Sequence, residues 1–531
     1  MSRLKVAVAL AVSIALLIVV LQPVAADKSF RYSFDVDEEG CTNVTIVFTD
    51  TESGSSWLLV PKSEINELHI YTWSGEVLSV EYEDFIEGGE ENPFYYVMRF
   101  SYKADDIFNM TLTYPMPYGA LVMEPNAIFI SPRVTHENTG YTRTITRLPA
   151  TATTSEDRVT SFSGIISDVS VEKSKQGVLV EASISSDDRV VVEYDVPPDG
   201  GEEVLQVENF VFEVPSRYVD YAVKVLDALN ESYPLFREAF GVDLEHIEVK
   251  FFVPSIEDLR TGLEGYVPFE GEQLGAIHLN LLYIRGVEGF LEVIALHELT
   301  HHFLWAIGVP PAHLWIHEGA AEYMSLTVGR MLGFEKAVDM HEQSLVELAG
   351  SLQGNIGFVQ EWTPFYTPPQ GLRLCYSASY YVFKYFGDRY GGLEFLKKLF
   401  HHLSGVEWSN DTAVFEAFGL AAGDVDGVLN LFREWGFTFR DKLALTSLVL
   451  RAKSDAEAMP TWLEPYKAIS SLTAKLAELL YYSNATGLSM LISALSLALS
   501  STSPYLMGIS IVVVVVALIA TYSSYRSDRR R

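Results

Sequence analysis

The sequence predicts a multidomain α+β fold: an N-terminal antiparallel β-sandwich, then an α+β domain followed by helices, and a single C-terminal transmembrane helix. Three observations predict this arrangement. Residues 29–195 consist mostly of short strand-like segments, helical patterns dominate after residue 204, and residues 505–522 form an uncharged apolar run. At 531 residues, the chain is long enough for two or three domains.

The first residues, 1–26, have the pattern of a secretory signal. Arg3 and Lys5 precede the apolar stretch Val6–Leu21, and small residues then lead to a cleavage site after Ala26. An uncleaved signal anchor is the alternative, because the apolar stretch is long for a cleaved signal.

Residues 27–196 are the predicted β-sandwich. Its strands are short, rich in β-branched and aromatic residues, and often alternate between apolar and polar positions. They are expected at Asn43–Phe48, Leu68–Trp73, Tyr95–Tyr102, Gly177–Ile184 and Arg189–Tyr194. Turn clusters rich in Gly and Ser separate them, which is typical of an antiparallel sandwich. The region has no cluster of His and no catalytic motif, so we expect a structural or substrate-positioning module.

Residues 197–204 form a linker rich in Pro and Gly, and the periodicity of the sequence changes after it. The elements expected after it are a helix near Tyr218–Phe240 and strands at His246–Val253 and Gly275–Tyr283. We expect the catalytic domain to span residues 205–345, with residues 346–482 as the helical C-terminal part of the same unit.

The motif H-E-x-x-H occupies His297–His301 in this domain. No Gly or Pro interrupts Val293–Trp305, and Pro310 follows soon after, so the motif is predicted to lie on a helix. Positions i and i+4 share one helix face. His297 and His301 can therefore bind one zinc ion together, since zinc accepts His nitrogens as ligands.

Glu318 is the candidate for the third zinc ligand. It lies on the next predicted helix, about Leu314–Leu332, which a short loop containing Pro would fold back against the first. Two His and one Glu, with a fourth position kept for water, form a catalytic zinc set. Glu298 is expected to act as the general base on the zinc-activated water. Glu322, on the same face as Glu318, is expected to support a metal-bound His, His297, from behind.

These residues resemble the gluzincin metallopeptidases, the clan of thermolysin and aminopeptidase N. In that clan, H-E-x-x-H is followed by Trp-x-x-Glu-Gly-x-Ala-x-Tyr. The matching residues are Trp315, Glu318, Gly319, Ala321 and Tyr323. The resemblance implies a thermolysin-like catalytic domain, one zinc ion and hydrolysis of peptide bonds. The segment between the second His and the Glu is shorter than in the aminopeptidase N branch, so the chain resembles a divergent member.

A second match to the aminopeptidase N branch implies a role for Tyr376. It precedes a segment that ends at Gly391 and Gly392, and the corresponding Tyr of that branch donates a hydrogen bond to the oxyanion. A core Tyr in an aromatic-rich helix is the alternative. Exopeptidases of the branch also carry a Gly-x-Met-Glu-Asn edge strand, whose Glu binds the substrate amine. The comparable stretch here, Gly275–Asn280, contains no Glu, so endopeptidase and aminopeptidase both stay open.

The C-terminal run, residues 505–522, is just long enough to span a bilayer as one helix. Four Arg lie in the following residues, 523–531, which are therefore predicted to form a cytoplasmic tail. Before the run, Gly487–Ser500 carries Ser at helical spacing. We expect residues 483–504 to form a juxtamembrane helix that packs on protein or lies in the membrane interface.

The formal net charge of the chain is −32. Leaving out the charge of +2 in residues 1–26 and of +3 in residues 505–531 gives −37 for residues 27–504. This acidity argues against nucleic acid and anionic lipid as partners. Cys41 and Cys375 are the only cysteines, and both a single long-range disulfide and two free thiols are compatible with the sequence.

Together, these features predict a zinc metallopeptidase, a hydrolase that acts on peptides or proteins outside the cytoplasm. One transmembrane helix would hold it in the cell membrane with its catalytic domain extracellular. Two other functions fit the same residues. One is a catalytically inactive surface binding or adhesion protein on a gluzincin scaffold, and the other is a hydrolase of substrates other than peptides.

Overall fold

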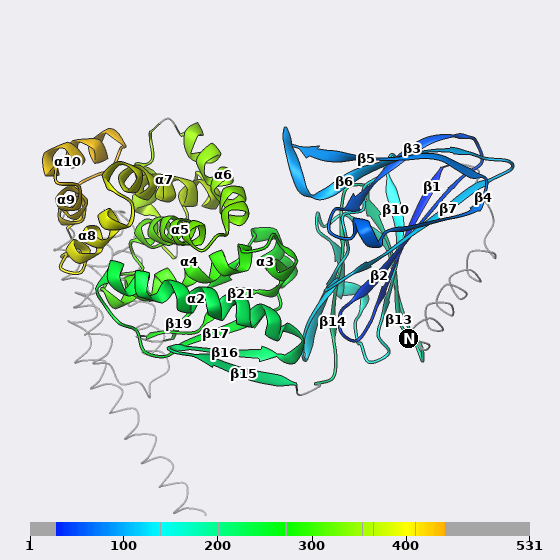
Figure 1. The fold of residues 1–531 in the computed structure, drawn as a ribbon, viewed down its shortest axis with the longest axis horizontal. Coiled ribbons are helices and arrows are strands. Elements are labelled where there is room, and N and C mark those ends of the chain that lie inside the picture. The colour runs from blue at the N-terminus through cyan, green and yellow to red at the C-terminus, as the bar shows by residue number, and fades with distance from the viewer. Residues whose placement is uncertain are drawn as a thin grey trace, which may run out of the picture.

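A computed structural model describes residues 28–440, apart from residues 139, 199–200, 271–272, 353, 365 and 409. Sheets fill its N-terminal half and helices its C-terminal half (Figure 1), which confirms the predicted α+β class at this level. The predicted signal, juxtamembrane helix, transmembrane helix and tail lie outside the described residues. None of the helices within residues 28–440 has the length and apolar character needed to cross a membrane.

The strands of the N-terminal half form three sheets. The seven-stranded sheet has the order β12 (Ile166–Ser174), β13 (Gly177–Ser185), β10 (Tyr141–Leu148), β1 (Ser29–Val36), β2 (Thr42–Asp50), β7 (Phe108–Met116) and β4 (His69–Ser74). The three-stranded sheet has the order β3 (Gly54–Pro61), β6 (Glu90–Lys103) and β5 (Glu76–Glu87). The four-stranded sheet has the order β11 (Val159–Ser161), β14 (Val190–Asp195), β9 (Asn126–Ile130) and β8 (Ala120–Met123).

The seven-stranded sheet is mixed, so the prediction of a wholly antiparallel sandwich was wrong. Strand β1 pairs antiparallel with β2 but parallel with β10, with Arg31 opposite Arg143. A tight turn forces an antiparallel pair only between strands that follow each other closely. More than 100 residues separate β1 from β10, so no turn fixes their relative direction.

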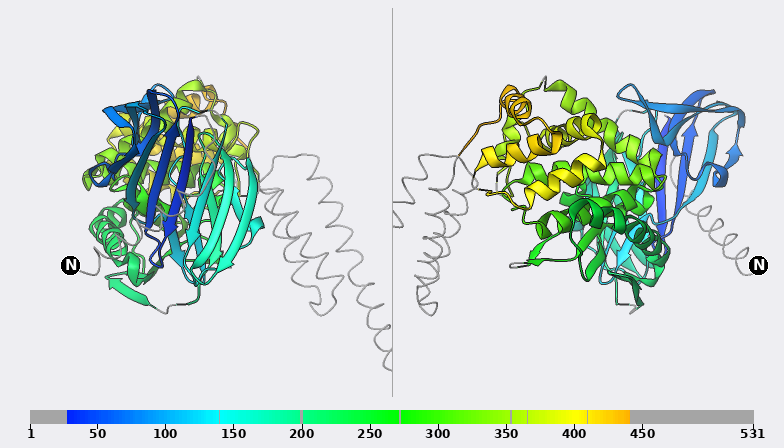
Figure 2. Two further views of the ribbon diagram at one scale, coloured as in Figure 1. Left: turned by 90° about the vertical axis from the view of Figure 1, so that its right-hand side faces the viewer. Right: turned by 60° about the vertical axis from the view of Figure 1, so that its left-hand side comes forward.

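The four-stranded sheet lies between two hydrophobic cores and contributes side chains to both. Along β9, Ala127 and Phe129 point into the core enclosed by the N-terminal sheets. Ile128 and Ile130 point into the core of the C-terminal half. This division follows from the alternation of side chains along a strand. The two halves of the chain therefore pack directly on each other, and the right view of Figure 2 shows them side by side.

The C-terminal half begins with a five-stranded sheet. Its order is β15 (Glu202–Val207), β16 (Phe210–Pro215), β17 (Ile247–Phe252), β21 (Ile277–Asn280) and β18 (Gly265–Tyr266). Strands β16, β17 and β21 are parallel, and β18 pairs antiparallel with β21 at the edge. The two-residue strands β19 (Phe269–Glu270) and β20 (Gln273–Leu274) pair with each other.

Helices cover this sheet (Figure 1): α2 (Val219–Phe240) and α3 (Ile256–Thr261) alternate with its strands along the chain, and the other helices follow β21. They are α4 (Phe290–Ala306), α5 (Leu314–Met331), α6 (Glu335–Ser351), α7 (Leu372–Tyr390), α8 (Leu393–Leu403), α9 (Asp411–Ala422) and α10 (Val425–Glu434). The helices predicted around residues 218–240, 293–305 and 314–332 agree with α2, α4 and α5. Helix α6 had no predicted counterpart, and it contributes a residue to the site.

Candidate metal centre

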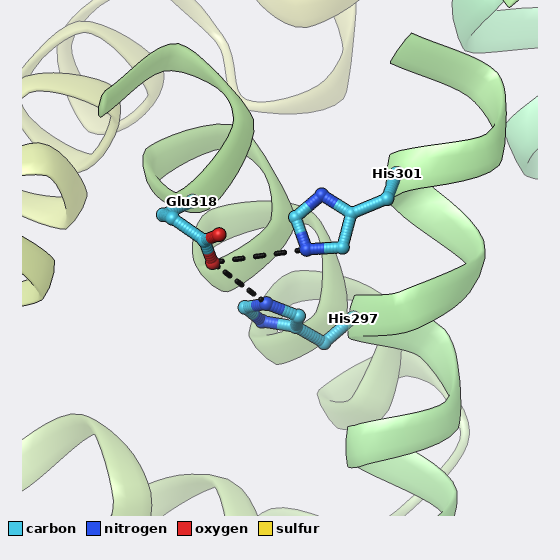
Figure 3. Close-up of side chains that lie close together, drawn as sticks. All are labelled: His297, His301 and Glu318. Carbon is cyan, nitrogen blue, oxygen red and sulfur yellow. Dashed lines mark hydrogen bonds and ion pairs between the residues drawn. The ribbon is translucent and has the colours of Figure 1, made fainter. Parts of the chain in front are cut away.

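His297 and His301 lie one turn apart on α4 and point toward α5 (Figure 3). Glu318 projects from α5 between them. Its Oε2 lies 3.2 Å from Nε2 of His297 and 3.7 Å from Nε2 of His301. One ligand atom from each of the three residues lies within 4.8 Å of the others. The structure thus brings together the three side chains that the sequence predicted as zinc ligands.

Gly319, the residue after Glu318, allows α5 to lie close to α7. A β-carbon at this position would lie 2.6 Å from the carbonyl oxygen of Ser379 and 2.6 Å from Cδ2 of Phe383. Any larger side chain would push the helices apart. The packing that holds the Glu318 backbone in place therefore depends on this Gly.

The charges around His297 favour a cation. Nδ1 of His297 lies 3.8 Å from Oε1 of Glu322, on the side of the ring opposite Glu318. Burial opposes a charge on this imidazole, but the two carboxylates raise the pKa of His297 well above its usual value. Burial lowers the pKa of His301 well below its usual value, so that ring is neutral and able to bind a metal. Two imidazoles and one carboxylate that converge in a field attracting positive charge fit one zinc ion.

Glu298 is buried next to these ligands, with 5% of its surface exposed. Burial raises the pKa of its carboxyl group to about 8, against the lowering effect of His297. The carboxylate lies against the edge strand, because a β-carbon on Gly265 would be 2.7 Å from its Oε1. A carboxyl group with a raised pKa can take up and release a proton near neutral pH.

The edges of the five-stranded sheet are β15 and β18, so the comparison of Gly275–Asn280 with an edge strand was wrong. Strand β21 within that stretch lies between β17 and β18. The carbonyl oxygen of Glu264, which immediately precedes β18, accepts a hydrogen bond from the backbone of Asn280 at 2.9 Å. Sequence reasoning missed Glu264. The signal that could have found it is a Glu between two Gly, at positions 262 and 265, in a short extended stretch.

Oε2 of Glu264 lies 3.9 Å from Nδ1 of His341, and the Glu264 side chain keeps 34% of its surface exposed. Burial raises the pKa of its carboxyl group, and Glu322 adds to the rise, while His341 and His297 oppose it. An accessible carboxylate directly before the strand that lies against Glu298 is placed to meet a positively charged group of a ligand.

His341, on α6, was also missed. Its Nε2 lies 2.8 Å from Oε2 of Glu322, the oxygen that does not face His297. Burial lowers the pKa of His341, but Glu322 and Glu264 raise it to about 9. Burial favours the neutral form of Glu322, yet His341 and His297 hold its pKa well below the usual range. Glu322 therefore lies behind His297, as the sequence predicted, with a partner that the sequence did not indicate.

Tyr376 lies on α7 with a half-buried ring, 5.0 Å from the ring of Trp362. Burial raises the pKa of its hydroxyl well above the usual value, and the charges of Glu318, Glu322 and Glu298 act in the same direction. The hydroxyl is therefore protonated and can donate a hydrogen bond.

Other residues with metal-binding or redox chemistry lie outside this group. Nε2 of His317 is 3.1 Å from the carbonyl oxygen of Val309, and His302 and His313 are not in the group of converging ligand atoms. Cys41 and Cys375 are free thiols in the structure, so the long-range disulfide is not formed.

No protein-family model and no curated protein matches the chain. Among solved structures, the chain is similar to native leukotriene A4 hydrolase from Saccharomyces cerevisiae, at 11% identity and a TM-score of 0.32, over 83% of this chain and 74% of that chain. It is also similar to an M1 zinc metallopeptidase from Deinococcus radiodurans, at 12% identity and a TM-score of 0.29, over 78% of this chain and 95% of that chain.

Proposed function

We propose that this chain is a zinc-dependent peptidase. The observation that carries the proposal is the convergence of His297, His301 and Glu318, whose ligand atoms lie within 4.8 Å of one another, beside the buried carboxyl group of Glu298. A binding protein without catalysis would have no need for a buried acid at this position, where burial costs free energy. The presence of Glu298 therefore favours hydrolysis over the inactive adhesion protein.

The residues divide the chemistry between them. His297, His301 and Glu318 would hold the zinc ion, which supplies Lewis-acid polarisation of water and of the substrate carbonyl. Glu298 accepts a proton from the attacking water and returns it to the leaving amine. Tyr376 donates a hydrogen bond to the oxygen that becomes negative as the carbonyl carbon turns tetrahedral. Its high pKa keeps this proton in place at neutral pH.

Within this proposal, Glu264 favours an aminopeptidase. Its carboxylate is 34% exposed, directly before the strand that touches the base. A protonated N-terminal amine is the positive group that a peptide presents next to its first peptide bond. An ion pair with Glu264 would hold that bond near Glu298, whereas a substrate with a blocked amine would lose this contact.

We also propose that the enzyme acts outside the cytoplasm, held by the apolar run at residues 505–522. Support for this comes from the sequence: the signal-like residues 1–26, the long uncharged run and the Arg-rich residues after it. Fractionation of cells that express the full chain, followed by protease treatment of intact cells, tests this location separately from the chemistry.

The test of the activity is Glu298→Gln in the full-length chain. Peptide cleavage should fall by about 10²–10⁴-fold, because the amide cannot take up the proton. Zinc content should stay at the wild-type level, since none of the three ligands is changed. Glu292→Gln is the matched control, because Glu292 is also buried on α4, with 7% of its surface exposed, and should retain activity.

Two results would contradict the proposal. Wild-type protein that neither contains zinc nor gains activity when zinc is added would favour the adhesion protein. Cleavage of esters or other amides without cleavage of any peptide in a mixed library would favour the hydrolase of other substrates.

A further inference from the structure

His341 lies between two carboxylates of the site. Its Nε2 is 2.8 Å from Oε2 of Glu322, and its Nδ1 is 3.9 Å from Oε2 of Glu264. Neither carboxylate belongs to the same element as His341: Glu322 comes from α5, and Glu264 precedes β18. One imidazole from α6 therefore joins the second metal-site helix to the edge strand.

The contact with Glu322 has a definite direction. A carboxylate oxygen accepts, so the Nε2–H of His341 donates to Oε2 of Glu322. The other oxygen, Oε1, faces Nδ1 of His297 at 3.8 Å. Only 6% of the Glu322 side chain is exposed, so it has little access to water and depends on protein partners. With one oxygen held by His341, the other is aimed at the ring that binds the metal.

The position of His341 is itself fixed, because its neighbour on α6, Glu342, forms hydrogen bonds with residues of α7. Glu342 accepts hydrogen bonds from the hydroxyl of Tyr380 and from the ammonium group of Lys384, the latter at 2.8 Å. Arg330 of α5 also forms an ion pair with Glu342. Helix α6 therefore cannot move away from the site without breaking this network, and the His341 ring has a firm support.

We propose that His341 is a positioning residue: it holds Glu322 behind the metal ligand His297 and thereby sets the affinity of the site for zinc. The inference rests on the proposed zinc site but not on which bond is cleaved. Carboxylates that orient a metal-bound His contribute 10–100-fold to metal affinity, and His341 would act through such a carboxylate. The imidazole also separates Glu322 from Glu264, so its loss would leave two carboxylates facing each other across a gap.

The test measures zinc affinity of the full-length chain by competition with a chromogenic chelator. His341→Leu removes the donor at similar volume and should weaken zinc binding by about 10–100-fold. His341→Gln keeps an N–H near the Nε2 position and should recover most of the affinity. Glu347→Gln is the matched control: it makes an acid-to-amide change at an exposed position of α6, outside the Glu342 network, and should leave zinc affinity within about threefold of wild type.

A double-mutant cycle with Glu322→Gln tests the route of the effect and replaces the single variant if His341→Leu does not fold. If His341 acts through Glu322, adding His341→Gln or His341→Leu to Glu322→Gln should change zinc affinity little. Unchanged zinc affinity in His341→Leu, an equal loss in the control Glu347→Gln, or additive losses in the cycle would each overturn the proposal. Wild-type protein that binds zinc but cleaves no peptide would overturn the peptidase and leave the role of His341 standing.

Discussion

Gly265 on the edge strand touches Glu298 on α4: a β-carbon at position 265 would lie 2.7 Å from Oε1 of the carboxylate. It would also lie 3.0 Å from the carbonyl oxygen of His278 and 3.0 Å from Cγ2 of Ile294. The strand therefore reaches the proposed base only because residue 265 has no side chain.

Gly265→Ala should lower kcat/KM for peptide cleavage by about 10²-fold, because a displacement of about 1 Å at a reacting group has effects of this size. Zinc content should stay unchanged, since Glu298 is not a ligand. Gly350→Ala is the matched control, because a β-carbon at Gly350 of α6 meets no atom within 4 Å. Wild-type kinetics in Gly265→Ala would show that the base does not depend on the strand.

Glu264→Gln should raise KM for peptides with a free N-terminal amine by about 10–100-fold, the value of one charge-assisted hydrogen bond. N-acetylated peptides lack the positive amine, so their cleavage should change little. Steady-state kinetics on such a matched pair separate the two cases. Glu257→Gln, an exposed acid on α3, serves as the control. Equal effects on both peptides would argue against amine recognition by Glu264.

Tyr376→Phe should reduce kcat by about 10²–10³-fold with little change in KM, because the lost hydrogen bond forms only in the transition state. Tyr381→Phe on the same helix is the control: its ring packs 5.8 Å from that of Trp435. If both variants keep wild-type kcat, Tyr376 is a core residue, the alternative that the sequence left open.

The burial of His136, a residue far from the metal centre in sequence, leads us to expect that the protein loses stability in acid. Its ring is buried, stacks on Phe30 at 4.1 Å, and accepts a hydrogen bond at Nδ1 from the backbone of Asn138. Burial lowers the pKa of His136 to about 4. In the unfolded chain, the imidazole takes up a proton below a pH of about 6.5. The free energy of unfolding therefore falls by on the order of 3 kcal/mol as the pH falls from about 6.5 to 4.

His136→Gln should flatten this part of the pH dependence, although it lowers stability at neutral pH. Urea unfolding of both proteins between pH 7 and pH 4, at about half-unit steps, measures the difference. If the free energies of wild type and variant fall in parallel over this interval, the acid sensitivity comes from other groups.

The motif-bearing helices could be predicted well, for a local reason. Helix α4 has no Gly or Pro, and the Pro-containing loop after it separates it from α5. The spacing of His297 and His301 follows from helix geometry. Predicting the position of Glu322 behind His297 needed only the same periodicity and the expectation that α5 folds back on α4.

Glu264 and His341 were not predicted, because the two Gly near Glu264 are only a weak local signal and His341 belongs to no local pattern. The strand that follows Glu264 is two residues long and exists only through its pairing with β21. His341 lies on a helix that buries few apolar side chains, so its periodicity is weak, and its contact with Glu322 joins residues 19 positions apart. The parallel pairing of β1 with β10 likewise depends on tertiary packing, because no turn fixes the relative direction of these strands.

Strand β9 has a consequence for how the chain can be cut. Ile128 and Ile130 fill the core of the C-terminal half, although both lie before the linker at residues 197–204. Each such side chain contributes about 1.5–3 kcal/mol when kept from water. A protease that cuts the chain between the halves would leave two fragments held together by these apolar contacts. A gene fragment that starts after the cut would instead yield a C-terminal half with its own interior open to solvent.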